Sequence, residues 1–105
     1  MRRQAFRMRL KPGMIDEYRR RHDEIWPELV AGLREAGISD YTIFHEPETN
    51  SLFAVRNLRD DDHLAEFMDS PVFRRWREYM LDIMEPDAAG KTAASTRLTE
   101  VFHLD

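Results

Sequence analysis

The spacing of the apolar residues changes along this chain, and those changes restrict its fold more than any other feature. Residues 4–10 alternate strictly between two faces, which is typical of a half-buried strand. The run Lys-Pro-Gly at 11–13 predicts a turn. From Met14 onward the apolar residues recur at helical spacing. Pro27 is suited to the first turn of a second helical segment, which Gly37 would cap.

Two more strands and two more helix starts follow. Residues 40–46 and 52–58 both alternate, and the composition of 47–50 between them, Pro-Glu-Thr-Asn, predicts a hairpin loop. Three aspartates at 60–62 supply an N-cap and an acidic first turn for a short helix. A serine followed by a proline at 70–71 marks the start of a longer helix with a well-defined apolar face.

A loop over residues 85–95 and a last strand over 97–104 complete the order strand, helix, strand, strand, helix, strand. This order predicts an α+β fold of the ferredoxin-like, split βαβ type (βαββαβ), with an antiparallel sheet that the helices cover on one face. The other face, carrying Tyr41 or Phe44, would be a large apolar surface on a monomer. We therefore expect a homodimer in which sheets or last strands are shared between subunits.

A chain of 105 residues has the usual length of one domain, and we expect residues 1–105 to form a single one. Such a chain has little room for an internal cavity, so we expect a site at the mouth of the sheet or at a subunit interface. The formal charge of −4 argues against a nucleic-acid partner. There is no cysteine for a disulfide or thiolate metal site, and no apolar run long enough to cross a membrane. The expectation is a soluble, cytoplasmic protein.

Histidine is the side chain that titrates closest to neutral pH, and the chain has four, at positions 22, 45, 63 and 103. No two of them have the spacing of helical metal ligands, and there is no glycine-rich phosphate loop, so nothing points to a metal site. His63 follows three aspartates at a helix start, so we expect it to be a solvated surface residue. The roles of His45 and His103 stay open.

Tyr18 and His22 are four residues apart near the end of the first helix, so their side chains lie on one helical face. Both can exchange protons, and both can reach one cavity. A structural explanation fits as well, with Tyr18 in the core and His22 as a C-terminal cap favoured by the helix dipole. Spacing alone favours that explanation. Trp76 likewise has core spacing, although an exposed tryptophan face also binds the apolar face of a sugar ring.

One segment is more specific than any fold requires: Glu17–His22 followed by Ile25–Leu29, Ile-Trp-Pro-Glu-Leu, since nothing in general helix design calls for it. Three further segments are Ala5-Phe6, Arg75-Trp76 with Tyr79-Met80, and Leu98–Phe102. With these segments the chain resembles the L-rhamnose mutarotase family over almost its full length. The resemblance implies the dimeric α/β barrel type of ferredoxin-like fold. It also implies a cofactor-free enzyme that interconverts the α and β anomers of L-rhamnose.

The resemblance implies roles for particular residues. His22 matches the proton donor of the family, and Tyr18, Tyr41 and Trp76 match residues that contact the sugar. Arg77 stands where the family often has a second tryptophan. An arginine there would stack on or hydrogen-bond the sugar, or point to solvent. We count it among the candidate substrate-binding residues.

Mutarotation opens the pyranose ring to the aldehyde and recloses it on the other face, so the ring oxygen gains a proton and the anomeric hydroxyl loses one. The hypothesis is that His22 protonates the ring oxygen while Tyr18 orients the sugar. The base is left open between Tyr41, Asp23 and a water molecule. The alternatives are another small dimeric ferredoxin-like enzyme, such as a monooxygenase, or a sugar-binding module without turnover.

Overall fold

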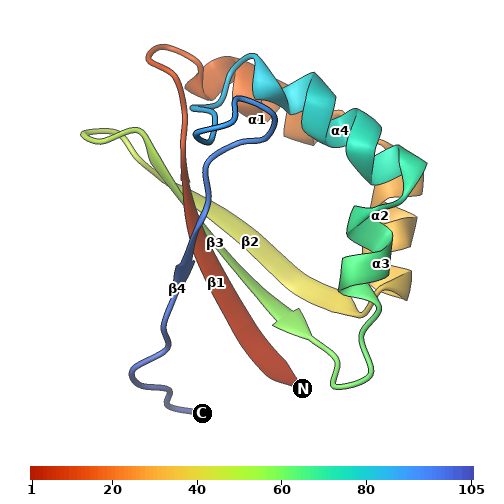
Figure 1. Cartoon of the computed structure of the whole chain (residues 1–105). Helices are drawn as coiled ribbons and strands as arrows, with labels where there is room; N and C mark the ends of the chain where they lie inside the picture. The colour runs from red at the N-terminus through yellow and green to blue at the C-terminus, as the bar shows by residue number, and fades with distance from the viewer.

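The computed structural model describes residues 1–105, and its elements follow the predicted order with each helical region split in two (Figure 1). The elements are β1 (Arg2–Arg9), α1 (Ile15–Asp23), α2 (Pro27–Glu35), β2 (Ile38–Glu46), β3 (Ser51–Leu58), α3 (Leu64–Met68), α4 (Pro71–Leu81) and β4 (Thr96–Leu98). No helix is long and apolar enough to span a membrane.

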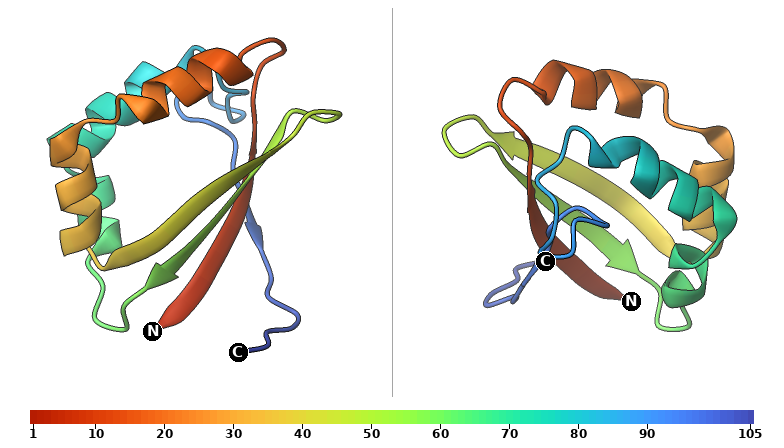
Figure 2. Two further views of the ribbon diagram at one scale, coloured as in Figure 1. Left: turned by 180° about the vertical axis from the view of Figure 1, so that it is seen from behind. Right: turned by 45° about the horizontal axis from the view of Figure 1, so that its top comes forward.

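The four strands form one sheet in the order β2-β3-β1-β4, and all neighbouring strands are antiparallel. This confirms the predicted α+β, ferredoxin-like fold. The helices all lie on one side of the sheet and arch over it, while the other side is left uncovered (Figure 2). The fold of a single chain therefore has an inner sheet face toward the helices and an outer face without a covering layer.

Local signals in the sequence set the ends of the helices. Pro27 opens α2 just after the extended Trp26, so the chain turns between α1 and α2. Gly37, with φ +105°, follows α2 in a conformation that other residues rarely adopt. Ser70 caps α4 by accepting a hydrogen bond from the backbone N–H of Phe73, and Pro71 stands at the first turn.

The buried apolar side chains gather at the two ends of the inner sheet face. The larger cluster joins α1, α2 and α4 to the ends of β1 and β3, and consists of Leu10, Tyr18, Leu29, Leu52, Trp76, Met80, Ile83 and Met84. The smaller cluster, Ile38, Leu58 and Leu64, joins the opposite ends of β2 and β3 to α3. Between the clusters, the middle of the inner face is not filled by core side chains.

The last strand is shorter than predicted. Only Thr96–Leu98 pairs with β1, opposite Ala5, Phe6 and Arg7, and residues 99–105 have no regular structure. Val101, Phe102 and Leu104 are almost fully exposed in the single chain. The apolar residues beyond Leu98 bury little surface within the single chain, so little there offsets the conformational entropy of ordering the backbone.

The outer sheet face carries Phe44, which is 60% exposed, beside Phe53 and next to Val55 on the neighbouring pairs of β2 and β3. Leu98 of β4 shares this face through its pairing with Ala5. Of the two aromatic residues considered for this face, the structure therefore places Phe44 on it, whereas Tyr41 turns to the inner side.

Candidate active site

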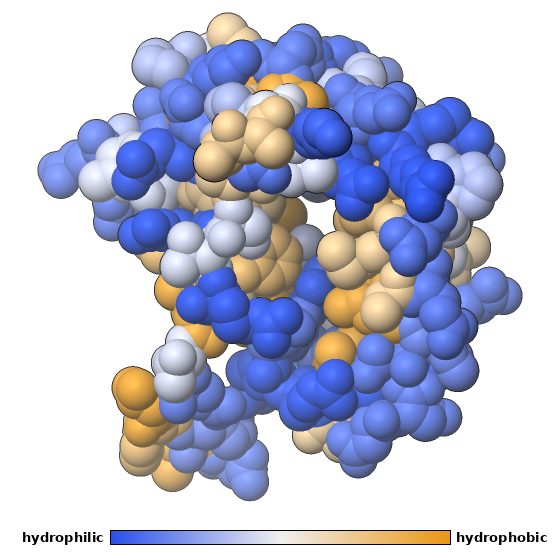
Figure 3. Space-filling model, in the orientation of Figure 1, coloured by the Kyte–Doolittle hydropathy of each residue, from blue (hydrophilic) through white to orange (hydrophobic).

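A cavity of about 1010 Å³ separates the helices from the middle of the inner sheet face. Figure 3 shows the molecule hollowed at this place, with hydrophobic residues gathered along the hollow. The space is open to solvent and is not an enclosed cavity, so it does not contradict the expectation that so short a chain has little room for an internal one. The helices are anchored at the two apolar clusters and arch between them, which leaves the space open. The volume lies in the range of small-molecule sites.

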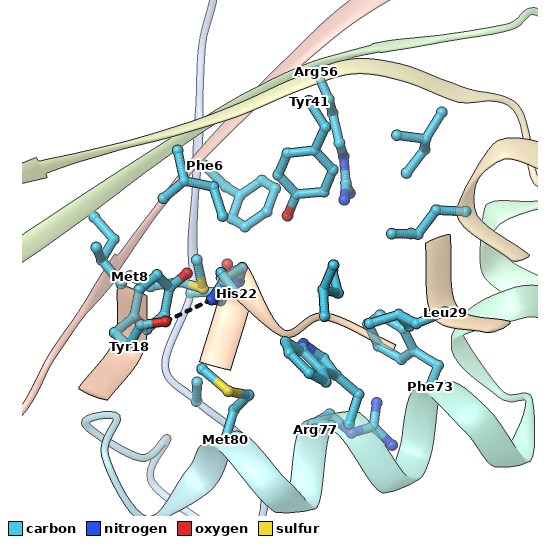
Figure 4. Close-up of a pocket in the computed structure, with 18 of the residues that line it drawn as sticks. Phe6, Met8, Tyr18, His22, Leu29, Tyr41, Arg56, Phe73, Arg77 and Met80 are labelled. Carbon is cyan, nitrogen blue, oxygen red and sulfur yellow. Dashed lines mark hydrogen bonds between the residues drawn. The ribbon is translucent and has the colours of Figure 1, made fainter. Parts of the chain in front are cut away.

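The helix wall of the cavity holds the predicted pair. Tyr18 and His22 both line the cavity, and their rings stack with centroids 4.2 Å apart. Nδ1 of His22 lies 3.0 Å from the backbone carbonyl oxygen of Tyr18, as the dashed line in Figure 4 marks. Because a carbonyl only accepts, Nδ1 carries the hydrogen of a neutral imidazole and Nε2 keeps its lone pair. The prediction that both side chains lie on one face and reach one cavity is confirmed.

Burial sets the ionisation of this pair. Desolvation lowers the pKa of His22, and the hydrogen bond to the Tyr18 carbonyl opposes it only in part. Burial likewise raises the pKa of Tyr18, whose phenol is thus held neutral. Near neutral pH the helix wall therefore presents a neutral imidazole and a protonated phenol.

Trp76 of α4 lies in a cluster of aromatic rings beside His22. Its ring meets His22 edge to face with centroids 5.4 Å apart, and meets Trp26 in the same manner at 5.1 Å. Tyr79 stacks on Trp26 with centroids 5.7 Å apart. Trp76 is buried and also lines the cavity, so it belongs to the core and to the candidate site at once. Its packing limits the rotation of the His22 ring.

Arg77 follows Trp76 on α4 and reaches the lining of the cavity. Its guanidinium lies over the ring of Phe73, 5.7 Å from the centroid, one helical turn away. Arg77 therefore stands at a different part of the cavity wall from Tyr18 and His22 (Figure 4).

The sheet wall of the cavity holds Tyr41 of β2, across from His22 (Figure 4). Its ring meets Phe6 of β1 edge to face, with centroids 6.5 Å apart. The guanidinium of Arg56 lies over both rings, 4.8 Å from the centroid of Phe6 and 5.3 Å from that of Tyr41. Burial in the cavity raises the pKa of Tyr41, and the neighbouring Arg56 cation opposes that rise.

Two residues of this wall had no part in the sequence prediction. Arg56 and Gln4 both line the cavity, and Arg56 Nε donates to Gln4 Oε1 at 2.7 Å. The alternation of residues 52–58 places Arg56 on the same face as the buried Leu52 and Ala54, and a charged residue on a core face was the available signal.

The remaining acidic and basic candidates divide between the cavity and the surface. Asp23 lines the cavity, and so does His45, whose Nε2 lies 3.3 Å from Asn50 Oδ1. His103 lies at the exposed chain end beside Arg3 and Asp105. No three His, Asp or Glu side chains gather as metal ligands would.

The family model described as L-rhamnose mutarotase matches residues 3–104. The chain belongs to the L-rhamnose mutarotase family. The L-rhamnose mutarotase of Sinorhizobium fredii is 51% identical over 104 residues, which is 99% of each chain. That of Burkholderia orbicola is 50% identical over 101 residues, or 96% of each chain.

Solved structures agree with this family and place its fold. The crystal structure of an L-rhamnose mutarotase from Formosa agariphila is 37% identical and covers 100% of both chains, with a TM-score of 0.88. An antibiotic biosynthesis monooxygenase is 17% identical, covers 94% of this chain and 97% of its own, and has a TM-score of 0.61. At that identity the second likeness shows the shared ferredoxin-like fold alone. The family and its fold thus agree with the residue pattern that suggested them.

Proposed function

We propose that the protein is an L-rhamnose mutarotase, an isomerase that interconverts the α and β anomers of the sugar. The observation that carries this proposal is His22 in a cavity large enough to hold a monosaccharide, with Nδ1 fixed on a backbone carbonyl and Nε2 open. The family membership supports the same activity. Interconverting anomers needs only proton transfer at two oxygens of one carbon, and a single well-placed imidazole suits that task.

His22 is the proton donor to the ring oxygen in this proposal. Since its resting imidazole is neutral and Nδ1–H is already used, Nε2 must first take up the proton that it delivers. The anomeric hydroxyl is bonded to the same carbon as the ring oxygen, and it is the nearest source. Nε2 takes the hydroxyl proton, the bond from C1 to the ring oxygen breaks as the C1 carbonyl forms, and Nε2 returns the proton to the ring oxygen.

Rotation about the C1–C2 bond and the reverse transfer then give the other anomer and restore neutral His22. Atoms and charge balance, and no cofactor is required. In this route His22 serves as both base and acid, so Tyr41 and Asp23 are free for binding. A positioned group of this kind contributes on the order of 10²–10⁴-fold in rate.

The other predicted residues would bind the sugar. Tyr18 on the helix wall and Tyr41 on the sheet wall offer phenols from opposite sides of the cavity. The indole of Trp76 would pack against the C–H face or the methyl group of the sugar. Arg77 would contact the part of the substrate that lies toward Phe73. These roles rest on the positions of the side chains along one cavity.

We further propose that the protein works as a homodimer in the cytoplasm. The outer sheet face, with Phe44, Phe53 and Leu98, is uncovered, and the apolar tail residues Val101 and Phe102 pack on nothing within the chain. A second copy would cover both, because each side brings the same apolar surface. The cytoplasmic location rests on the cysteine-free composition.

The test is NMR exchange between the two anomers of L-rhamnose, measured with and without the protein. The proposal predicts faster exchange with protein, in a colourless preparation. A haem absorption band would favour the monooxygenase alternative, and sugar binding without faster exchange would favour a binding module. Repeating the assay with L-fucose, mannose and ribose measures which sugars the site accepts.

A further inference from the structure

Arg56 is a half-buried cation without an acidic partner. Its guanidinium lines the cavity from the inner face of β3, and it takes part in none of the ion pairs of the protein. Its hydrogen bond to a side-chain oxygen runs from Nε to Gln4, the residue opposite it on β1. A buried charge without a counter-charge is costly unless other oxygens accept its hydrogen bonds.

The sheet is built irregularly at this point. Ser39 pairs with Asn57 and Thr42 pairs with Val55, so two residues of β2, Asp40 and Tyr41, stand opposite Arg56 alone. This is a β-bulge, and Asp40 adopts φ +49°, in the left-handed region. The bulge turns Tyr41 toward the cavity and against Arg56. Bulges of this kind often re-aim side chains at active sites.

The orientation of Arg56 is fixed on three sides. Gln4 holds Nε, and the guanidinium carbon lies over the rings of Phe6 and Tyr41. Nη1 and Nη2 are therefore left for the Tyr41 hydroxyl and for whatever the cavity contains. A guanidinium donates in a rigid planar fork, which suits two neighbouring oxygens of one ligand. Arg97, on the same inner face opposite Phe6, adds a second positive charge and no acceptor.

We propose that Arg56 binds the sugar, donating hydrogen bonds from Nη1 and Nη2 to hydroxyl oxygens on the side of the ring away from His22. This inference rests on the proposed function, because it names a further contact in the same cavity. Arg56 would hold the substrate between the sheet wall and the helix wall, so that the anomeric carbon faces Nε2 of His22. It would also hold Tyr41 in place through the stacking contact.

The experiment compares Arg56→Met and Arg56→Lys with the unaltered protein in the anomer exchange assay. Methionine keeps the apolar contact with Phe6 and lacks every donor, whereas lysine keeps the charge and loses the fork. Arg74→Met is the matched control, since Arg74 is an exposed residue of α4 whose contact is a loose 3.9 Å pair with Asp69. Each protein is also assayed with deoxy analogues of L-rhamnose that lack one ring hydroxyl each. L-rhamnose affinity is measured separately by calorimetric titration.

We expect Arg56→Met to lower kcat/KM by about 10- to 100-fold, in keeping with loss of charged hydrogen bonds, and Arg56→Lys to recover part of it. In the unaltered protein, kcat/KM for one deoxy analogue should be much lower than kcat/KM for L-rhamnose. In Arg56→Met that difference between the two substrates should shrink. Arg74→Met should behave as the unaltered protein. A purely structural role would lower the rates for all analogues alike and leave that difference unchanged.

The proposal is overturned if kcat/KM of Arg56→Met stays within twofold of that of the unaltered protein. It is also overturned if Arg56→Met is less active but discriminates between L-rhamnose and each deoxy analogue as strongly as the unaltered protein does. Failure of the proposed function is a separate result: the unaltered protein would not accelerate exchange. In that case the calorimetric titration with L-rhamnose tests whether Arg56 contacts the sugar. Weaker L-rhamnose binding by Arg56→Met supports its contact with the sugar, whereas equal binding, or no binding by either protein, overturns it. Should Arg56→Met not fold, the analogue pattern of Arg56→Lys gives the same decision.

Discussion

His22 owes its properties to contacts that leave only one nitrogen available. The Tyr18 carbonyl fixes the Nδ1 hydrogen, while the rings of Tyr18 and Trp76 pack against two sides of the imidazole. Burial disfavours the charged ring, so the resting histidine is neutral. In the proposed mechanism it gains a proton only from the substrate. A group that takes up and delivers a proton works best with a pKa close to the working pH. The pKa of His22 is lowered from the ordinary histidine value, which lies near neutrality.

The lowered pKa of His22 has a pH signature. An ordinary imidazole is half protonated at about pH 6.5, whereas neutral His22 should persist to lower pH. We expect the protein-catalysed rate to hold as pH falls from 7.5 to about 6.5 and to drop only at lower values. The spontaneous rate is subtracted at each pH, and an NMR titration of the imidazole nitrogens follows protonation directly.

The same shift affects stability with a definite sign. Below about pH 6.5 the unfolded chain binds a proton at this histidine before the native protein does, so the free energy of unfolding falls as pH falls. Replacing His22 by glutamine should reduce this part of the pH dependence. A His22 that titrates at or above the ordinary value would contradict the account.

Tyr18→Phe separates the phenol from the rest of the residue. The variant keeps the ring that stacks on His22 and the backbone carbonyl that orients Nδ1, and it removes only the hydroxyl. One lost neutral hydrogen bond to the sugar predicts a fall in kcat/KM of about 2- to 10-fold, measured by anomer exchange. An unchanged kcat/KM would show that the phenol does not contact the substrate.

The contrast between His22 and Arg56 shows what sequence can predict at this scale. Tyr18 and His22 meet because they are four residues apart on one helix, and that is a local property. Arg56 and Gln4 are 52 residues apart and meet only through the register of β1 and β3. The bulge beside them depends on one residue, Asp40, taking a left-handed conformation. Neither the register nor the bulge is visible in the pattern of apolar residues.

Among the elements, the contact of α1 with α4 matters most for the site, because α1 carries Tyr18 and His22 and α4 carries Trp76. Arg21, which is 8% exposed, joins the two helices. It donates to the Tyr79 carbonyl at 2.6 Å, to Asp82 at 2.9 Å and to Glu17 of its own helix at 2.7 Å. Its guanidinium also lies over the ring of Tyr79. The end of α4 is therefore tied to the turn of α1 that presents His22.

Arg21→Met should lower the free energy of unfolding by about 1–3 kcal/mol, because it removes charged hydrogen bonds and leaves the Tyr79 carbonyl without this donor. The Asp82 carboxylate is 68% exposed, so its ion pair is screened and contributes little of that total. Urea unfolding measures the change. Arg20→Met is the matched control, since the neighbouring Arg20 pairs only with exposed or half-exposed Glu17 and Glu24. It should cost clearly less than Arg21→Met, because its ion pairs are exposed to solvent. Equal losses in the two variants would contradict this expectation.

The order and type of the elements were open to prediction, but the space between them was not. Apolar periods and the signals at Pro27, Gly37 and 70–71 marked helices and strands correctly. They do not say how far a helix stands from the sheet, so the size of the cavity was not foreseen. The last strand was predicted too long because residues 97–104 were assigned to one strand from their apolar content, whereas only Thr96–Leu98 pairs in the single chain and Val101 and Phe102 are exposed.

On the scale of the whole molecule, a single chain leaves the outer sheet face and the tail of residues 99–105 uncovered. A dimer that buries Phe44 and its neighbours would remove this apolar surface from water, and each square ångström of it contributes roughly 25 cal/mol. The cavity opens on the other side of the sheet, toward the helices. Dimer formation would therefore stabilise the sheet that carries Tyr41 and Arg56 without blocking the helix wall.

Phe44→Glu tests this arrangement. A charge at Phe44 on the outer face would be buried unpaired in a dimer that covers this face, so the variant should be monomeric in light scattering. Its mass should be near 12.5 kDa, where the unaltered protein has twice that mass. Glu46→Gln at the exposed end of the same strand serves as the control and should leave the mass unchanged. An unaltered protein that is monomeric at micromolar concentration would contradict the dimer.

In the proposed mechanism, His22 in the cavity carries the proton transfer that interconverts the anomers of L-rhamnose. The most direct measurement is the NMR exchange rate between the anomers with the unaltered protein, with His22→Ala and with no protein, after near-ultraviolet circular dichroism has shown that both proteins are folded. The account predicts clear acceleration by the unaltered protein and a loss of about 10²- to 10⁴-fold in His22→Ala. Exchange no faster than the spontaneous rate, or equal exchange with folded His22→Ala, would contradict it.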